Sequence, residues 1–268
     1  MKFPAPIAPF DTEALRRSVK AAKPFPFFSV DNFLDPGFAN RVLESFPSFE
    51  SALKQGNSFN AVNESGKVQM TDSETFAPAV KELNEALASQ EWIDVLSYVM
   101  DIPNLLPDDK LVGGGIHQTG PRGHLDVHVD FNYLAKRDLH RRLNILVYFN
   151  KNWKPEWGGN VELWDKDVKV CHHSSSPIFN RCVVFATSEI SFHGVTAVKC
   201  PEGNSRKSFA AYYYTKEAPL GWDGTAHSTI FKARPNEVTK KWLSMPMEKA
   251  GRKLAEWKHN LGQMLRGK

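Results

Sequence analysis

Two histidines and an aspartate in the middle of the chain have the residue types and spacing of a metal site. His128 and Asp130 flank Val129 in a strand-like segment, and alternate residues on a strand share a face. An imidazole and a carboxylate on one face can take two adjacent positions around a metal ion. His193, in a later strand-like segment, offers a third ligand. Two histidines and one carboxylate form the facial triad of non-haem Fe(II) oxygenases, which leaves coordination positions open.

The tripeptide His128–Asp130 alone has a structural alternative, because such residues also occur as a hydrogen-bonded pair on a half-buried strand. Asp126 shares a face with His128 and competes with Asp130 as the ligand. His124 lies on the same face, where we expect a rim or structural role. We also expect His117 to be structural. His172 and His173 precede a run of serines and are expected in a solvated loop.

The wider sequence favours the metal site, because a series of motifs follows in a fixed order. After the tripeptide come Arg142–Asn150, Trp153, Gly158–Leu163, Asn180–Phe185, His193–Val195 and Arg206–Ser208. This series resembles the prolyl-hydroxylase-like branch of the 2-oxoglutarate/Fe(II) oxygenases. The resemblance covers about residues 111 to 217, and the helices expected before it are similar to those that usually precede this core.

The resemblance implies a double-stranded β-helix, mainly β with flanking helices, that carries the metal in one mouth of the barrel. It implies Fe(II), 2-oxoglutarate and O₂ as cofactors, with ascorbate as a candidate stimulant. His128, Asp130 and His193 would be the iron ligands, and Arg206 with Ser208 would bind the distal carboxylate of 2-oxoglutarate, since a guanidinium matches a carboxylate with two parallel hydrogen bonds. Further residues expected at the cosubstrate are Tyr148, Asn144, Leu146, Val161 and Gln118.

Several of these residues have simpler interpretations. Tyr148 could be an ordinary core residue, and Arg206 could be a surface arginine at the start of a strand. Ser208 is uninformative without the family context.

The remaining sequence supplies elements that could position these residues. Helical periodicity and caps predict helices near residues 11–22, 35–46, 76–88 and 91–100, whereas the polar stretch Lys54–Lys67 is expected to be an exposed loop. Alternation then predicts strands at Leu111–Gln118, His124–Asn132, Leu143–Asn150, Asn160–Trp164, Cys182–Ala186, Phe192–Val198 and Ser208–Thr215. We expect a supporting region at 1–109, the catalytic core at 110–217 and an extension at 218–268, together forming one integrated domain.

Composition limits the class of protein. The 268 residues carry a net charge of +4 with 41% apolar residues, and no apolar run is long enough to predict a transmembrane helix. The excess positive charge lies after Pro235, so the rest of the chain does not predict a nucleic-acid-binding surface. Three cysteines without a Cys-x-x-Cys pair favour a reducing cytoplasm.

The substrate is less well defined by the sequence. Lys136, Arg137, His140 and Arg141 form a basic cluster after the tripeptide, which could attract an anionic small molecule, although a solvated loop explains it equally well. A basic helix carrying Leu254, Trp257 and Leu261 would pack on its own barrel, dock a second subunit to form a homo-oligomer, or lie on an anionic membrane.

The leading hypothesis is therefore a dioxygenase that hydroxylates an unactivated C–H bond of a small, anionic or sugar-like metabolite. One alternative is a hydroxylase of prolyl or other residues in a protein. The other is a barrel that binds a metal or ligand without catalysis.

Overall fold

The structure, a computed structural model, describes residues 1–237 and 239–240. Its helices are α1 (Thr12–Ala21), α2 (Pro36–Ser45), α3 (Phe49–Gln55), α4 (Pro78–Ala88) and α5 (Gln90–Met100), with short 3₁₀ helices at Ser73–Thr75 and Pro155–Trp157. Its strands are β1 (Phe27–Val30), β2 (Asn57–Asn60), β3 (Glu64–Met70), β4 (Leu106–Pro107), β5 (Gly115–Val129), β6 (Tyr133–Leu134), β7 (Leu139–Tyr148), β8 (Val161–Trp164), β9 (Cys171–Ser175), β10 (Cys182–Ala186), β11 (His193–Val195), β12 (Arg206–Thr215) and β13 (Ile230–Lys232).

The strands form one continuous antiparallel sheet in the order β1-β10-β7-β12-β5-β11-β8-β9. β5 is long enough to pair with β12 through its first half and with β11 through its second half, so it belongs to both layers of the folded sheet. This curled all-antiparallel arrangement is a double-stranded β-helix, as the sequence predicts.

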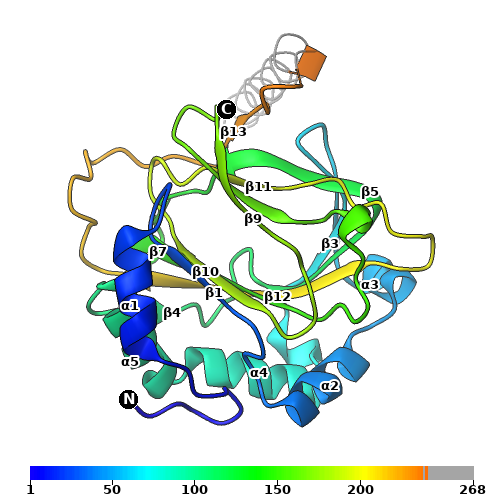
Figure 1. Ribbon diagram of the computed structural model, residues 1–268, viewed down its shortest axis with the longest axis horizontal. Helices are drawn as coiled ribbons and strands as arrows, with labels where there is room; N and C mark the ends of the chain where they lie inside the picture. The colour runs from blue at the N-terminus through cyan, green and yellow to red at the C-terminus, as the bar shows by residue number, and fades with distance from the viewer. Residues whose placement is uncertain (238, 241–268) are drawn as a thin grey trace, which may run out of the picture.

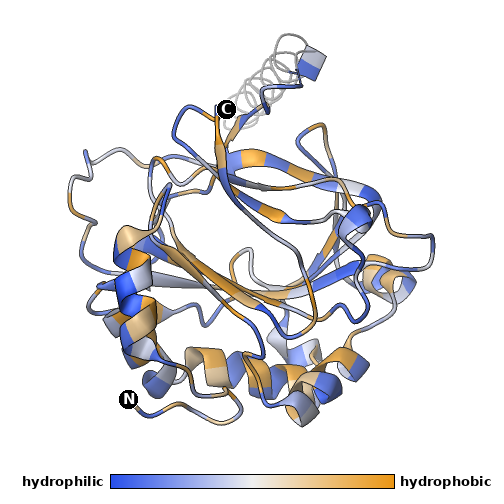
Figure 2. Cartoon of the chain, viewed as in Figure 1, coloured by the Kyte–Doolittle hydropathy of each residue, from blue (hydrophilic) through white to orange (hydrophobic). Residues whose placement is uncertain are grey.

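The helices lie against one layer of the sheet. Figure 1 shows α1, α2, α4 and α5 on the side of β1, β10 and β12 that faces away from β9 and β11. The main core fills the space between them and includes Phe33, Val42, Trp92, Val184 and Phe209, all 0% exposed. In Figure 2 the apolar colour is concentrated in β1 and β10, while the helices carry both colours because only their inner faces are buried.

The helix starts follow from the local sequence. The Asp35 carboxylate accepts a hydrogen bond from the Phe38 amide at 2.8 Å, and Pro36 occupies the first turn of α2. Asp11 caps α1 and Ser89 caps α5 in the same way. These helices therefore form where their caps and apolar stripes predict them.

Three predicted segments differ from the structure. Lys54–Lys67 is not a loop: after α3 it contributes β2 and the start of β3, because pairing of β3 with β5 satisfies the backbone of a polar strand. The segments Leu111–Gln118 and His124–Asn132 are joined in the single strand β5. His172 and His173 lie on β9, paired with β8, and the His173 ring packs on Phe27 at 4.4 Å.

The C-terminal part is only partly described. β13 pairs with the second half of β5, where Phe231 lies opposite His128. The predicted basic helix with Leu254, Trp257 and Leu261 lies outside the described residues. None of the helices within the described ranges is both long and apolar enough to span a lipid bilayer.

Candidate metal centre

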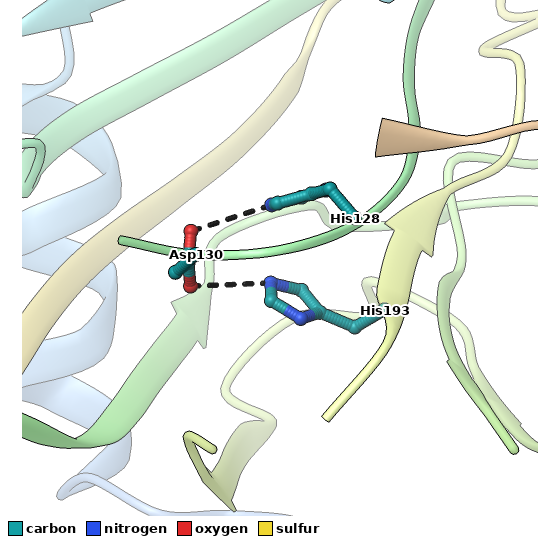
Figure 3. Close-up of side chains that lie close together, drawn as sticks. All are labelled: His128, Asp130 and His193. Atoms are coloured by element: carbon teal, nitrogen blue, oxygen red, sulfur yellow. Dashed lines mark ion pairs between the residues drawn. The ribbon is translucent and has the colours of Figure 1, made fainter. Parts of the chain in front are cut away.

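Two paired strands bring the His128, Asp130 and His193 side chains together. His193 opens β11 directly opposite His128 on β5, and Asp130 follows the end of β5. The Asp130 carboxylate lies between the rings, with Oδ1 3.4 Å from His128 Nε2 and Oδ2 3.4 Å from His193 Nε2 (Figure 3). One potential ligand atom from each residue lies within 4.8 Å of the others, so the three side chains can meet at one ion.

Hydrogen bonds on the far side of each ring fix which nitrogen faces the ion. His128 Nδ1 lies 2.8 Å from the Asp126 carbonyl, and His193 Nδ1 lies 2.9 Å from the Ser191 carbonyl. A carbonyl can only accept, so each Nδ1 carries a hydrogen, and the lone pair of the neutral ring then lies on Nε2. This arrangement also fixes the ring orientation of metal-binding histidines.

The protonation states also suit a metal. Burial, together with the neighbouring His128, lowers the pKa of His193 to about 4, so its ring is neutral at neutral pH. Burial alone would raise the pKa of Asp130, but Arg141, His193 and His128 together outweigh burial and hold that pKa well below its usual range. Metal ligands must be a neutral imidazole and an ionised carboxylate, and these side chains are both.

A second set of side chains holds the Asp130 carboxylate in place. Asn144 Nδ2 donates to Asp130 Oδ2 at 2.8 Å, and Arg141 Nη2 lies 3.1 Å from the same oxygen. Arg141 also donates to Asn144 Oδ1 through Nε and Nη2. The Arg141 guanidinium stacks on the rings of Tyr212 and Phe131, 3.6 and 4.6 Å from their centroids. Asp130 is therefore oriented before any ion binds.

A cavity of about 230 Å³ extends from this triad to Arg206, at the start of β12. Arg206 is 4% exposed and its protein partners are all neutral. It donates to the Gly159 carbonyl at 2.7 Å, the Tyr148 hydroxyl at 3.1 Å and Ser208 Oγ at 3.4 Å. Burial lowers its pKa, and it forms no ion pair with a carboxylate of the described chain. A buried cation without a counter-ion is costly, so this end of the cavity is suited to an anion.

Gly159 shapes the Arg206 site in a way that another residue could not. Its φ is +72°, and a Cβ there would lie 3.0 Å from Arg206 Cδ. Because an L side chain is strained at this φ and would push the guanidinium, the glycine is needed where the backbone approaches Arg206.

Most, but not all, of the residues predicted to contact the cosubstrate line the cavity. Asn144, Leu146, Val161, Ser208 and Arg206 line the cavity. Tyr148 is fully buried behind it and reaches the site through its hydroxyl bond to Arg206.

Gln118 is the exception. It donates to the Pro47 carbonyl at 2.8 Å, accepts from Ser205 and does not line the cavity, so its predicted role at the cosubstrate is wrong.

The misplacement of Gln118 has a structural cause. β3 pairs with β5 through a register shift near Gly123: Ser65 lies opposite His124, and Lys67 lies opposite Thr119. The shift reverses which residues face inward, so His117 and Thr119 line the cavity while Gln118 faces away. His117 and Thr119 form cross-strand rows with Ser208 and Arg206, respectively. Sequence spacing from His128 could not reveal them, because it assumes an unbroken alternation.

The basic cluster is also divided by the structure. Arg137 pairs with Asp108 and Asp109 outside the cavity, whereas Arg141 lies in β7 and lines it. His140 packs against Trp222, 4.4 Å between ring centroids. The cluster is therefore no common anion surface, and Arg141 is the only member that reaches the metal centre.

The other acidic and basic candidates are separated from the triad. Asp126 turns its carboxylate to Lys240, at 2.6 Å, rather than to His128 and His193. His124 lines the cavity and forms hydrogen bonds with Ser65 and the Val62 carbonyl. Lys67 also lines the cavity; it was not identified from the sequence because its segment was expected to be a loop.

Comparison with known proteins agrees with this geometry. Residues 114–214 match the sequence model of the 2OG-Fe(II) oxygenase superfamily. The match covers less than half of the chain, and through this segment the chain is similar to that superfamily. It is a dioxygenase, and its cofactors are Fe(II), 2-oxoglutarate and O₂.

Solved structures support the fold of this oxygenase. A prolyl hydroxylase from Trichoplax adhaerens, in complex with a hypoxia inducible factor peptide fragment, is similar over 76% of this chain and 91% of its own, with 20% identity and a TM-score of 0.53. A Pseudomonas putida prolyl-4-hydroxylase is similar over 75% of this chain and 98% of its own, with 19% identity and a TM-score of 0.51. No curated protein matches the sequence.

Proposed function

We propose that this oxygenase binds Fe(II) through His128, Asp130 and His193 and hydroxylates an unactivated C–H bond of a small metabolite. The observation that carries the proposal is the convergence of two imidazole rings and a carboxylate at one wall of a cavity. This donor set fits ferrous iron and leaves positions for a cosubstrate and O₂.

We further propose that Arg206 binds the distal carboxylate of 2-oxoglutarate, with Ser208 and Tyr148 supplying hydroxyl groups. The support is the absence of any carboxylate partner for Arg206 among the described residues. Its planar guanidinium would fix the cosubstrate in one orientation, and the Tyr148 hydroxyl bond keeps the guanidinium from rotating.

The bound iron and cosubstrate supply the oxidising chemistry, in which O₂ is consumed and 2-oxoglutarate is converted to succinate and CO₂. The protein holds the ligands, orients the cosubstrate and excludes water. Phe59 on β2 and Phe231 on β13 line the cavity, and their apolar rings would help to exclude water. Excluding water limits wasteful turnover in the absence of substrate.

The size of the cavity favours a small substrate. Its volume of about 230 Å³ lies below the range of roughly 300–1,000 Å³ that is usual for ligand pockets. A peptide would have to project one side chain into this space, and hydroxylation of a protein residue is the alternative that a substrate screen must include.

Two measurements test the proposal. Anaerobic addition of Fe(II) and 2-oxoglutarate should produce a weak visible charge-transfer band in the wild type, and a colourless protein would favour a non-catalytic barrel. A screen of metabolites and prolyl peptides for stimulated succinate release should then yield small-molecule hits. Hits confined to peptides would contradict the proposed substrate class and leave the metal assignment intact.

A further inference from the structure

The charges that line the cavity do not balance once the cofactors are counted. Histidines and Tyr212 aside, the ionisable side chains that the described residues contribute to its wall are Glu64, Lys67, Asp130, Arg141 and Arg206. Glu64 and Lys67 neutralise each other, since Lys67 Nζ lies 2.7 Å from Glu64 Oε1. Under the proposed function, Arg206 is neutralised by the distal carboxylate of 2-oxoglutarate.

Arg141 has one anionic partner, and the metal shares it. Within the described chain its only carboxylate contact is Asp130, at 3.1 Å. The two charges of Fe(II) are balanced by Asp130 and by the near carboxylate of 2-oxoglutarate. The positive charge of Arg141 is then left over in the loaded centre.

Arg141 keeps this positive charge, and its side chain is shielded from water. Arg141 is 4% exposed, and a guanidinium is not deprotonated in proteins. Its other contacts are the neutral groups Asn144, Tyr212 and Phe131. A buried charge without a counter-ion is strongly unfavourable, so an anion that enters the cavity is stabilised there.

We propose that Arg141 binds an anionic group of the substrate, a carboxylate or a phosphate, beside the metal. This inference rests on the proposed function. The rings of Tyr212 and Phe131 cover the faces of the guanidinium, so the anion must bind at its edge, where the planar donors can form parallel hydrogen bonds. Because Arg141 contacts a metal ligand directly, the oxidised carbon lies within a few bonds of the anionic group.

The proposal can be tested by binding, without turnover. The protein is loaded anaerobically with Fe(II) and 2-oxoglutarate and titrated with propionate, propionamide and inorganic phosphate, followed by calorimetry and by the shift of the visible band. We expect one of the two anions to bind at least tenfold more tightly than propionamide. Which anion binds more tightly distinguishes a carboxylate substrate from a phosphate ester.

The variants Arg141→Gln and Arg141→Lys assign the preference to this residue. Arg141→Gln should remove the tenfold preference, and Arg141→Lys should retain part of it. Arg142→Gln is the matched control, because Arg142 is the next residue of β7, bonds to Thr215 and does not line the cavity; it should retain the full preference.

The outcomes separate this inference from the proposed function. A wild type that binds Fe(II) and 2-oxoglutarate but shows no preference for an anion overturns the role of Arg141 alone. An anion that binds equally well to Arg141→Gln is held by the metal, which also overturns it. A wild type that fails to bind 2-oxoglutarate contradicts the proposed function itself. If Arg141→Gln does not fold, the wild-type preference and the Arg141→Lys result decide.

Discussion

Replacement of Arg206 by methionine should change cosubstrate binding and folding stability in opposite directions. Arg206 is buried, and its hydrogen bonds go to a carbonyl and two hydroxyls. Methionine keeps most of the buried volume and removes the charge. In the protein without cosubstrate, this change removes the desolvation cost of a cation that has no counter-ion. Such replacements often leave the free energy of unfolding unchanged or raise it.

In the complex the same substitution leaves the distal carboxylate of 2-oxoglutarate buried and unpaired. Breaking a buried charge pair from one side costs about 3–5 kcal/mol, which corresponds to a rise in Kd of about 100- to 4,000-fold. Arg206→Lys keeps a point charge and loses the planar pair of donors. We expect its Kd to rise by about 10- to 100-fold, as for loss of one hydrogen bond to a charged group.

The assay is an anaerobic titration of the Fe(II) protein with 2-oxoglutarate, paired with thermal unfolding of the protein without cofactors. Fe(II) affinity should be unchanged in Arg206→Met, because Arg206 is not among the three candidate metal ligands. Arg142→Met serves as the control for loss of an arginine outside the cavity. An unchanged Kd for 2-oxoglutarate, or an equal loss of Fe(II) and 2-oxoglutarate binding, would refute the reasoning.

Three further predictions follow from the same geometry. Asp130→Ala should abolish Fe(II)-dependent succinate formation because an incomplete triad remains, whereas Asp126→Asn should retain metal binding; the reverse result would exchange their assignments. Gly159→Ala should lower the free energy of unfolding by about 1–3 kcal/mol and weaken 2-oxoglutarate binding, since it adds strain at φ +72° and a contact with Arg206. Gly203→Ala, with φ +83° and no neighbour within 4 Å, should show the strain without the binding defect.

The third concerns pH and His117, whose pKa is held well below its usual range by burial and by the charges of Lys67 and Arg206. Below about pH 6.5, His117 binds a proton in the unfolded chain but stays neutral in the folded protein. The contribution of the neutral ring to folding stability is therefore fully present above about pH 6.5 and is lost as the pH falls. In denaturant unfolding between pH 5 and 6.5, His117→Asn should flatten the pH dependence by up to about 1.4 kcal/mol per pH unit, and identical slopes would contradict the burial argument.

Many of the helices and strands could be predicted from the local sequence. The predicted strand Cys182–Ala186 is confirmed as β10, and the helix after Asp35-Pro36 begins as its cap predicts. Such elements depend on neighbours a few residues away, which the sequence displays directly. β2 and β3 could not be found in this way, because their polar residues become strands only when β5 is beside them.

The sequence by itself determined the chemistry, because few side-chain types bind ferrous iron and they stand in an ordered series of motifs. It could not determine every side chain that lines the cavity. The register shift beside Gly123 reversed the inward face of β5, so that His117 and Thr119 line the cavity and Gln118 does not. Pairing across strands likewise placed Lys67 in the wall and Arg141 beside Asp130. These outcomes depend on contacts between distant segments, where a shift of one residue changes the face of every side chain that follows.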